Sequence, residues 1–165
     1  AKEMWADLDR FRRELGTDYI DIMLLHCMMD GNWPERKKAA MEVLSQAREE
    51  GIIRAHGVSC HTLKALEAAA ESDWVQVDMA RFNPAGVAMD ADVPTVTKVL
   101  KKMKDKGKGI IGMKVVGAGR LTKDIDKCLQ YQLANEFIDT FTIGQESSEE
   151  HDDLRRRIPE ASVRG

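Results

Sequence analysis

The chain has 165 residues, 43% of them hydrophobic and 32% charged, with a formal net charge of -3. That size and polarity predict one soluble domain over residues 1–165. They exclude a membrane protein, because no apolar run approaches the length of a bilayer-spanning helix. The slightly acidic balance gives no reason to expect a nucleic acid or a membrane surface as a partner.

Apolar spacing along the chain predicts helices that alternate with short strands. Three- and four-residue spacing marks helices over 2–15, 34–50, 62–72, 95–106, 125–135 and 148–157. Short apolar or alternating runs mark a strand that ends at His26 and further strands over 52–59, 73–79, 109–115 and 137–143. This α/β order predicts a parallel sheet, either doubly wound with five strands or part of an eight-stranded barrel.

Polar side chains accompany the predicted strands. His26 and Ser59 end the first two, Gln76 lies in the third, and Lys114 lies near the end of the fourth. Ligands and catalytic groups gather at the carboxyl ends of the strands in parallel α/β folds, so this pattern indicates an enzyme site for a small molecule. No GxGxxG follows a strand and no GxxxxGK[ST] is present, which argues against a Rossmann turn and a P-loop.

The cysteines indicate a reducing compartment. Cys27, Cys60 and Cys128 are an odd number without CxxC spacing, which argues against a disulfide scaffold, and we expect a cytoplasmic protein. His26-Cys27 and Cys60-His61 end neighbouring strands, but adjacent strand residues point to opposite faces. At most two of these side chains can share a site, so no metal centre is predicted.

Three motifs resemble those of the aldo/keto reductases. They are LGTDYID over residues 15–21 with His26, EGIIRAHGVS over 50–59, and WVQV over 74–77, in the family's order and spacing. GIIGMK over 109–114 and FTIG over 141–144 resemble its seventh and eighth strands. The resemblance implies a (β/α)8 TIM barrel, of which this chain would supply about five βα units, strands four to eight. Because the motifs match strands four to eight, we interpret the chain as the carboxyl-terminal portion of such a barrel.

The resemblance also implies an activity, the NAD(P)H-dependent reduction of aldehydes or ketones by hydride transfer from nicotinamide. The partner would be a small carbonyl substrate. The family's catalytic Asp, Tyr and Lys belong to the first three strands, and the family's DTAxxYG signature has no counterpart in this sequence. The catalytic histidine alone has a match, at His26.

Residue by residue, the resemblance gives His26 the role of polarising the substrate carbonyl. Ser59 would bind the nicotinamide carboxamide, with Gln76 beside it. Cys60 stands where the family usually has Asn, and a thiol cannot offer both an amide donor and an acceptor.

Further cofactor contacts are implied in the second half of the chain. Met113 stands where the family places an aromatic residue that stacks on nicotinamide, and Lys114 follows it; Met-Lys here resembles a subgroup of bacterial members. Gly117 and Gly119 would cover the pyrophosphate.

The segment after the fifth strand bears on the nucleotide. NADPH-preferring members place Lys and Arg there, whereas this chain has Gly144 followed by carboxylates at Glu146, Glu149, Glu150, Asp152 and Asp153. These would repel a 2′-phosphate, so a preference for NADP over NAD is doubtful. Glu146 could instead accept hydrogen bonds from a ribose diol.

Two other interpretations stay open on sequence alone. One is a non-catalytic fragment or truncated module that keeps the fold without the catalytic residues. Five strands cannot close the barrel, so such a piece would need a homo-oligomer, strand exchange or a further segment to cover its strand edges. The other is a flavodoxin-like domain, for which the segment CMMDGNW over 27–33 is a poor phosphate loop.

Overall fold

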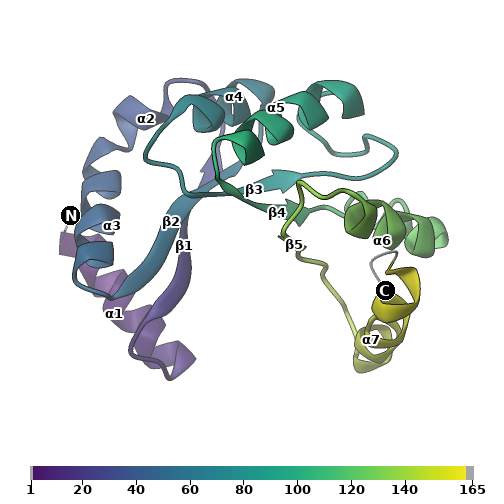
Figure 1. The fold of residues 1–165 in the computed structure, drawn as a ribbon. Coiled ribbons are helices and arrows are strands. Elements are labelled where there is room, and N and C mark those ends of the chain that lie inside the picture. The colour runs from purple at the N-terminus through teal and green to yellow at the C-terminus, as the bar shows by residue number, and fades with distance from the viewer. Residues whose placement is uncertain (1, 163–165) are drawn as a thin grey trace. The chain divides into compact units, whose positions relative to one another are not determined.

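The computed structural model describes residues 2–162, and within them it shows an α/β fold with a five-strand parallel sheet (Figure 1). The strand order is β1-β2-β3-β4-β5. The strands are β1 (Ile20–Met28), β2 (Ile53–Cys60), β3 (Val77–Arg81), β4 (Gly109–Met113) and β5 (Thr140–Phe141). The helices are α1 (Lys2–Leu15), α2 (Trp33–Arg36), α3 (Lys38–Glu49), α4 (Leu63–Glu71), α5 (Val93–Asp105), α6 (Ile125–Ala134) and α7 (Ser148–Ala161), with a 3₁₀ turn η1 (Thr122–Asp124) before α6.

The chain divides into two compact units at the bond between residues 78 and 79, here called unit 1 and unit 2. Among residues 2–162, no helix has the length and apolar character needed to cross a membrane.

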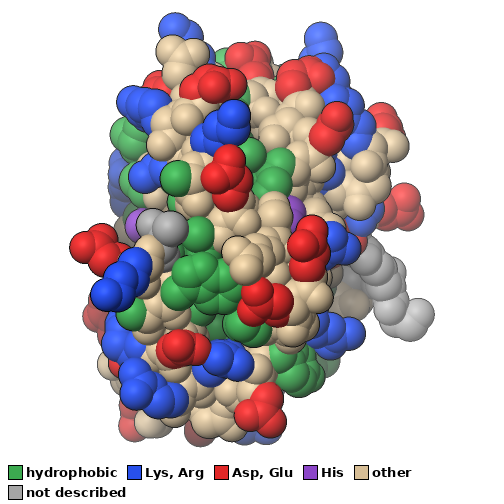
Figure 2. Space-filling view, turned by 90° about the vertical axis from the view of Figure 1, so that its left-hand side faces the viewer, with side chains coloured by type: hydrophobic (Ala, Val, Ile, Leu, Met, Phe, Trp, Pro, Cys, Tyr) green, Lys and Arg blue, Asp and Glu red, His purple; other side chains and the backbone are tan. Residues whose placement is uncertain are grey.

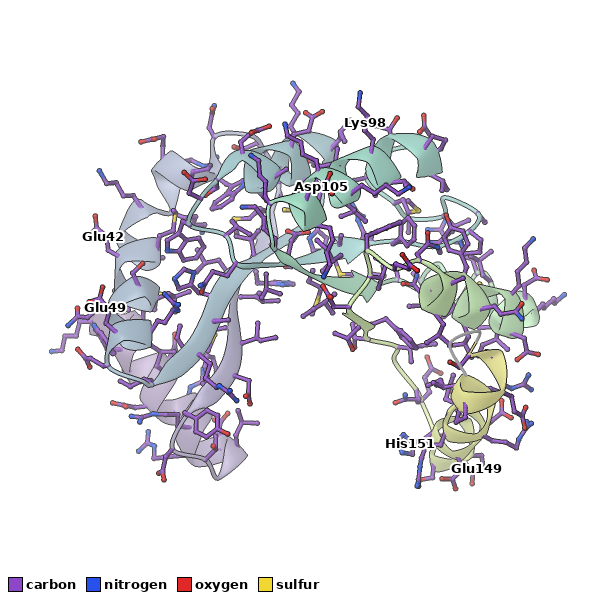
Figure 3. All side chains as sticks on the ribbon, in the orientation of Figure 1. Glu42, Glu49, Lys98, Asp105, Glu149 and His151 are labelled. Carbon is purple, nitrogen blue, oxygen red and sulfur yellow. The ribbon has the colours of Figure 1, made fainter. Side chains whose placement is uncertain are left out.

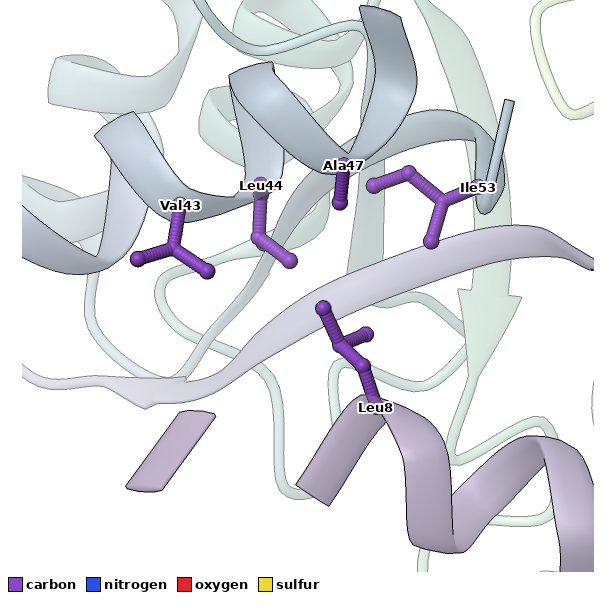
Figure 4. Packing of buried hydrophobic residues seen from close by; sticks show 5 residues of the cluster. All are labelled: Leu8, Val43, Leu44, Ala47 and Ile53. Carbon is purple, nitrogen blue, oxygen red and sulfur yellow. The ribbon is translucent and has the colours of Figure 1, made fainter. Parts of the chain in front are cut away.

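The core of unit 1 lies between helices α1 and α3 and the strands β1 and β2. Figure 4 shows its buried members, Leu8 of α1, Val43, Leu44 and Ala47 of α3, and Ile53 of β2. Each large apolar side chain that leaves water here stabilises the fold by about 1.5–3 kcal/mol. The sequence pattern predicted this apolar stripe on both helices.

The outer surfaces of α1 and α3 are polar. Glu42 and Glu49 of α3 are exposed and project away from the strands (Figure 3). On this face of unit 1, acidic and basic side chains are interspersed with hydrophobic ones (Figure 2). Gly16 and Gly51 end the two helices with φ of +65° and +75°, a conformation that glycine adopts without steric cost.

Unit 2 has its own core, formed where α6 and α7 pack together. Its buried members are Val115, Cys128, Leu129, Leu154 and Ala161. Gln132 of α6 is also buried, at 1% exposure, and its Nε2 donates to the carbonyl of Phe82 at 2.5 Å. This bond ties α6 to the residue that follows β3.

Several predicted element bounds are wrong. The third strand was expected over 73–79 but runs from Val77 to Arg81, because residues 73–76 form a turn after α4 in which the amide of Val75 donates to the carbonyl of Ser72. The helix expected over 34–50 is broken at Lys37 into α2 and α3. The fifth strand shrinks to Thr140–Phe141, and α7 continues to Ala161, past Pro159.

Candidate active site

In unit 1, His26 lies near the carboxyl end of β1, as the sequence predicted. The strand continues for two residues beyond it, to Met28. The side chain of His26 is exposed, whereas Met28 is buried. An exposed imidazole at this end of a parallel strand is placed where α/β folds bind their ligands.

A β-bulge follows His26. Leu25 pairs with Val58 and Met28 pairs with Cys60. Two residues of β1 therefore lie between these pairs, whereas β2 has one. The extra residue is Cys27, whose φ is +62°, a left-handed conformation that is uncommon for a residue with a side chain. Bulges of this kind re-aim neighbouring side chains and occur beside active sites.

The hydroxyl of Ser59 lies opposite the bulge. It accepts a hydrogen bond from the backbone amide of Cys27 at 2.9 Å, and its Oγ is 3.2 Å from Nδ1 of His26. Ser59 is only 2% exposed. The structure therefore places His26 and Ser59 together. The expected partner of Ser59 was the nicotinamide carboxamide, whereas in the structure its hydroxyl lies within hydrogen-bond distance of His26.

The residues that follow Ser59 are Cys60 and His61. Cys60 is fully buried, so its thiol faces the interior of unit 1. The ring of His61 meets the ring of His26 edge to face, with centroids 5.7 Å apart. Among residues 2–162, no three His, Cys, Asp or Glu side chains are grouped so that they could hold a metal ion.

Gln76 does not lie at the carboxyl end of a strand. It precedes β3 and pairs with the middle of β2. The backbone amide of Gln76 donates to the carbonyl of His56 at 3.1 Å, and its side-chain Oε1 accepts from the backbone amide of His56 at 3.2 Å. His56 stacks on Trp74 with ring centroids 4.3 Å apart. Burial lowers the pKa of His56 below its ordinary value, and the positive charge of Arg48 lowers this pKa further.

In unit 2, the carboxyl end of β4 leads into a tight turn that carries the predicted cofactor residues. Met113 ends the strand and is 7% exposed, while Lys114 follows it with an exposed side chain and a φ of +56°. The amide of Gly117 donates to the carbonyl of Lys114 at 2.8 Å. A Cβ at Gly117 would lie 2.9 Å from the side chain of Val87, whereas one at Gly119 would meet open space.

Asn83, in the loop that follows β3, organises this part of unit 2. It is fully buried, and its Nδ2 donates to the carbonyls of Val87 at 2.7 Å and Lys114 at 3.1 Å. Its Oδ1 accepts from the amides of Ala85 at 3.2 Å and Val87 at 3.1 Å. The Asn-Pro pair at 83–84 signals a turn, but nothing in the sequence reveals that the side chain reaches the residue after β4.

After β5, Gly144 and Glu146 lie in an exposed segment that leads to α7. Ser147 caps the helix by accepting from the amide of Glu150 at 3.2 Å, and the carboxylate of Glu150 accepts from the amide of Glu146 at 2.8 Å. Glu149 and His151 project from this first turn (Figure 3). Hydrogen bonds from its own backbone amide and from Ser147 hold the pKa of Glu149 below its ordinary value, so this carboxylate stays charged.

The arginines of α7 are engaged by carboxylates. Arg156 pairs with Asp153 and with Glu160, and Arg157 pairs with Asp153 and with Asp126. Hydrogen bonds from Arg157 hold the pKa of Asp153 below its ordinary value. The first turn of α7 thus presents carboxylates, while the cations of the helix are neutralised further along it.

An open hollow in unit 1 is lined by Asp9, Arg12, Arg13 and Thr17, among others. It lies where α1 leads into β1, at the opposite end of that strand from His26. It is therefore separate from the candidate site.

A model of the aldo/keto reductase family matches residues 1–153. A curated relative, D-threo-aldose 1-dehydrogenase of a Pseudomonas species, is 25% identical over 122 residues, which are 74% of this chain and 36% of that protein.

Solved structures show the same fold. A Pseudomonas aeruginosa protein assigned to the aldo-keto reductases superposes with a TM-score of 0.74 at 18% identity and covers 96% of this chain and 58% of its own. An aldo-keto reductase of Klebsiella pneumoniae in complex with NADPH gives a TM-score of 0.58 at 20% identity, covering 92% of this chain and 63% of its own. The 165 residues thus span less than two thirds of each of these proteins.

Proposed function

Because the chain belongs to the aldo/keto reductase family, we propose that the protein is an oxidoreductase that reduces aldehydes or ketones with a nicotinamide nucleotide. The observation that carries the proposal is His26, an exposed imidazole held by Ser59 near the carboxyl end of β1. The curated relative, a dehydrogenase of an aldose by its name, supports the same class of chemistry.

The bound nucleotide would supply hydride to the carbonyl carbon. The carbonyl oxygen gains negative charge as the hydride arrives, and a neutral imidazole with a proton on its exposed nitrogen can donate a hydrogen bond to it. A fixed donor aimed at a developing oxyanion contributes about 10²–10³-fold to kcat. This is the role that we assign to His26.

The residues proposed to hold the nucleotide fit it unequally. Lys114, Gly119, Gly144 and Glu146 are exposed, so an ammonium, a carboxylate and open backbone are available to phosphate and ribose groups. Gly117 sits where a larger residue would clash with Val87, which keeps the turn after β4 compact.

Other proposed contacts fit less well. Cys60 is fully buried, Met113 is 7% exposed, and Oε1 of Gln76 is bonded to the backbone. The hydroxyl of Ser59 is already engaged by Cys27 and His26. For these residues a direct contact with nicotinamide would require side chains to turn toward it.

For the nucleotide, we propose that NADPH is not preferred over NADH. Glu146, Glu149 and Glu150 surround the start of α7, and a second phosphate charge there would be repelled. Reversing one charge by Glu146→Lys should raise kcat/KM for NADPH relative to NADH. The matched control is Glu42→Lys on α3, the same charge change at an exposed position of unit 1, which should leave the ratio unchanged. An enzyme that already prefers NADPH strongly would contradict this proposal.

The main test measures consumption of NADH and NADPH by the purified protein with a panel of aldehydes and ketones. His26→Ala should lower kcat by about 10²–10³-fold. His151→Ala, which removes an exposed imidazole from α7, should leave kcat unchanged. A folded protein that consumes neither nucleotide would refute the enzymatic proposal and favour a non-catalytic module of reductase fold, since no DTAxxYG motif is present in residues 1–165.

A further inference from the structure

The bulge in β1 gives Ser59 a structural task. In a parallel pair, backbone amides bond to carbonyls of the neighbouring strand. Cys27 is the extra residue of the bulge, and its amide donates to the side chain of Ser59 at 2.9 Å instead. The serine hydroxyl therefore replaces a ladder carbonyl at the point where β1 departs from regular pairing.

The direction of this bond decides what the hydroxyl can do next. A hydroxyl has one hydrogen to donate and two lone pairs to accept with. The amide of Cys27 can only donate, so it occupies a lone pair of Oγ and leaves the hydroxyl hydrogen free. Ser59 is 2% exposed, and a buried hydroxyl hydrogen without an acceptor is costly.

The acceptor within reach is Nδ1 of His26, 3.2 Å from Oγ. Among residues 2–162, Cys27 and His26 are the two hydrogen-bond partners that the structure gives this hydroxyl. If Nδ1 carried the proton, two donors would face Oγ and the hydroxyl hydrogen would have no acceptor. If Nδ1 is unprotonated, every group is satisfied.

We propose that Ser59 is a positioning residue that fixes His26 in the tautomer with its proton on Nε2. The bulge at Cys27 polarises and orients the hydroxyl, the hydroxyl donates to Nδ1, and Nε2–H is left as the donor on the exposed ring. The use of this donor on a carbonyl oxygen rests on the proposed function, but the tautomer does not. Ser59 then acts through His26, and its hydroxyl is not available to the nicotinamide carboxamide.

The experiment is an NMR measurement on the protein with ¹⁵N-labelled histidine. Long-range proton–nitrogen correlations at about pH 8.5, where an ordinary imidazole is neutral, identify which ring nitrogen carries the proton. His26→Gln assigns the His26 signals among the four histidines. We expect the proton on Nε2 of His26 in the wild type.

Variants then test the source of this state. Ser59→Ala should shift the Nδ1 resonance of His26 and make the Cys27 amide exchange with solvent about tenfold faster, as expected for one lost hydrogen bond. Ser59→Thr keeps the hydroxyl and should restore both readouts. The matched control is Ser45→Ala, which removes another serine hydroxyl bonded to a ring nitrogen, that of Trp74 at 3.0 Å, and should change neither.

A proton on Nδ1 in the wild type overturns the inference, and so does a Ser59→Ala protein whose His26 and Cys27 signals match the wild type. If Ser59→Ala does not fold, the wild-type tautomer and Ser59→Thr decide the question. The result separates the two proposals. Reductase activity with Nδ1 protonated refutes this inference alone, and the Nε2 tautomer without activity refutes the proposed function alone.

Discussion

Replacing Gly57 by alanine should disrupt unit 1 severely. Gly57 belongs to the HGVS segment of β2, and an added Cβ would lie 1.7 Å from the carbonyl oxygen of Val77 and 2.7 Å from its carbonyl carbon. Both atoms are backbone, so no side chain can turn aside. To reach even 3.0 Å, β3 would have to move by about 1.3 Å.

The cost follows from this displacement. Overpacking alone costs about 1–3 kcal/mol, and the two hydrogen bonds between Gln76 and the backbone of the adjacent His56 would add about 1 kcal/mol each if they broke. We therefore expect the free energy of unfolding of Gly57→Ala to fall by about 3 kcal/mol or more. With an m-value of about 2 kcal/mol/M, the urea midpoint should fall by about 1.5 M.

The assay is urea unfolding followed by circular dichroism. The matched control is Gly31→Ala in the same unit, where the nearest backbone atom, the carbonyl oxygen of Lys64, lies at an ordinary 3.5 Å. The free energy of unfolding of Gly31→Ala should stay within about 0.5 kcal/mol of the wild-type value. A Gly57→Ala protein as stable as this control would refute the close approach of β3 to β2.

Two further changes test other parts of the fold. Asn83→Ala removes four hydrogen bonds from a buried side chain and should lower the free energy of unfolding of unit 2 by about 3 kcal/mol. Asn135→Ala loses one hydrogen bond, to the carbonyl of Tyr131, and should lower this free energy by about 1 kcal/mol. Equal losses would contradict the organising role of Asn83. The pKa of His56 is lowered in the folded state, so the unfolded chain binds more protons as the pH falls through the ordinary histidine range, and the unfolding free energy should drop between about pH 7.5 and 5.5. His56→Phe, which keeps a ring on Trp74, should flatten this dependence; an unchanged profile would assign it to other groups.

The presence of β1 and β4 could be predicted because their signal is local, but their ends could not: the strands were expected to end at His26 and at residue 115, and they end at Met28 and at Met113. Short apolar runs before His26 and from Gly109 onward mark the two strands, although Met28 alone among the residues of β1 is buried. The helices α1 and α3 were likewise marked by their apolar stripes. The glycine of the HGVS segment is explained by the structure, which brings the backbone of β3 against it.

Other features depend on contacts distant in sequence. Residues 73–79 alternate like a strand, yet Trp74 turns back to donate to Ser45 at 3.0 Å, and β3 begins only at Val77. The left-handed conformation of Cys27 has no sequence signal, because β-region backbone is the default for a residue in an apolar strand. Lys108 follows a run of exposed lysines but is itself 5% exposed. In each case tertiary packing overrides the local pattern.

We propose that hydride passes from a nicotinamide to a carbonyl carbon while His26 donates a hydrogen bond to the carbonyl oxygen. The most direct test uses a nucleotide that carries deuterium at the transferable position of C4. Mass spectrometry of the alcohol product should find one deuterium on the former carbonyl carbon with the wild-type protein and little labelled product with His26→Ala. Unlabelled product, or labelled product at the same rate from both proteins, would contradict the account.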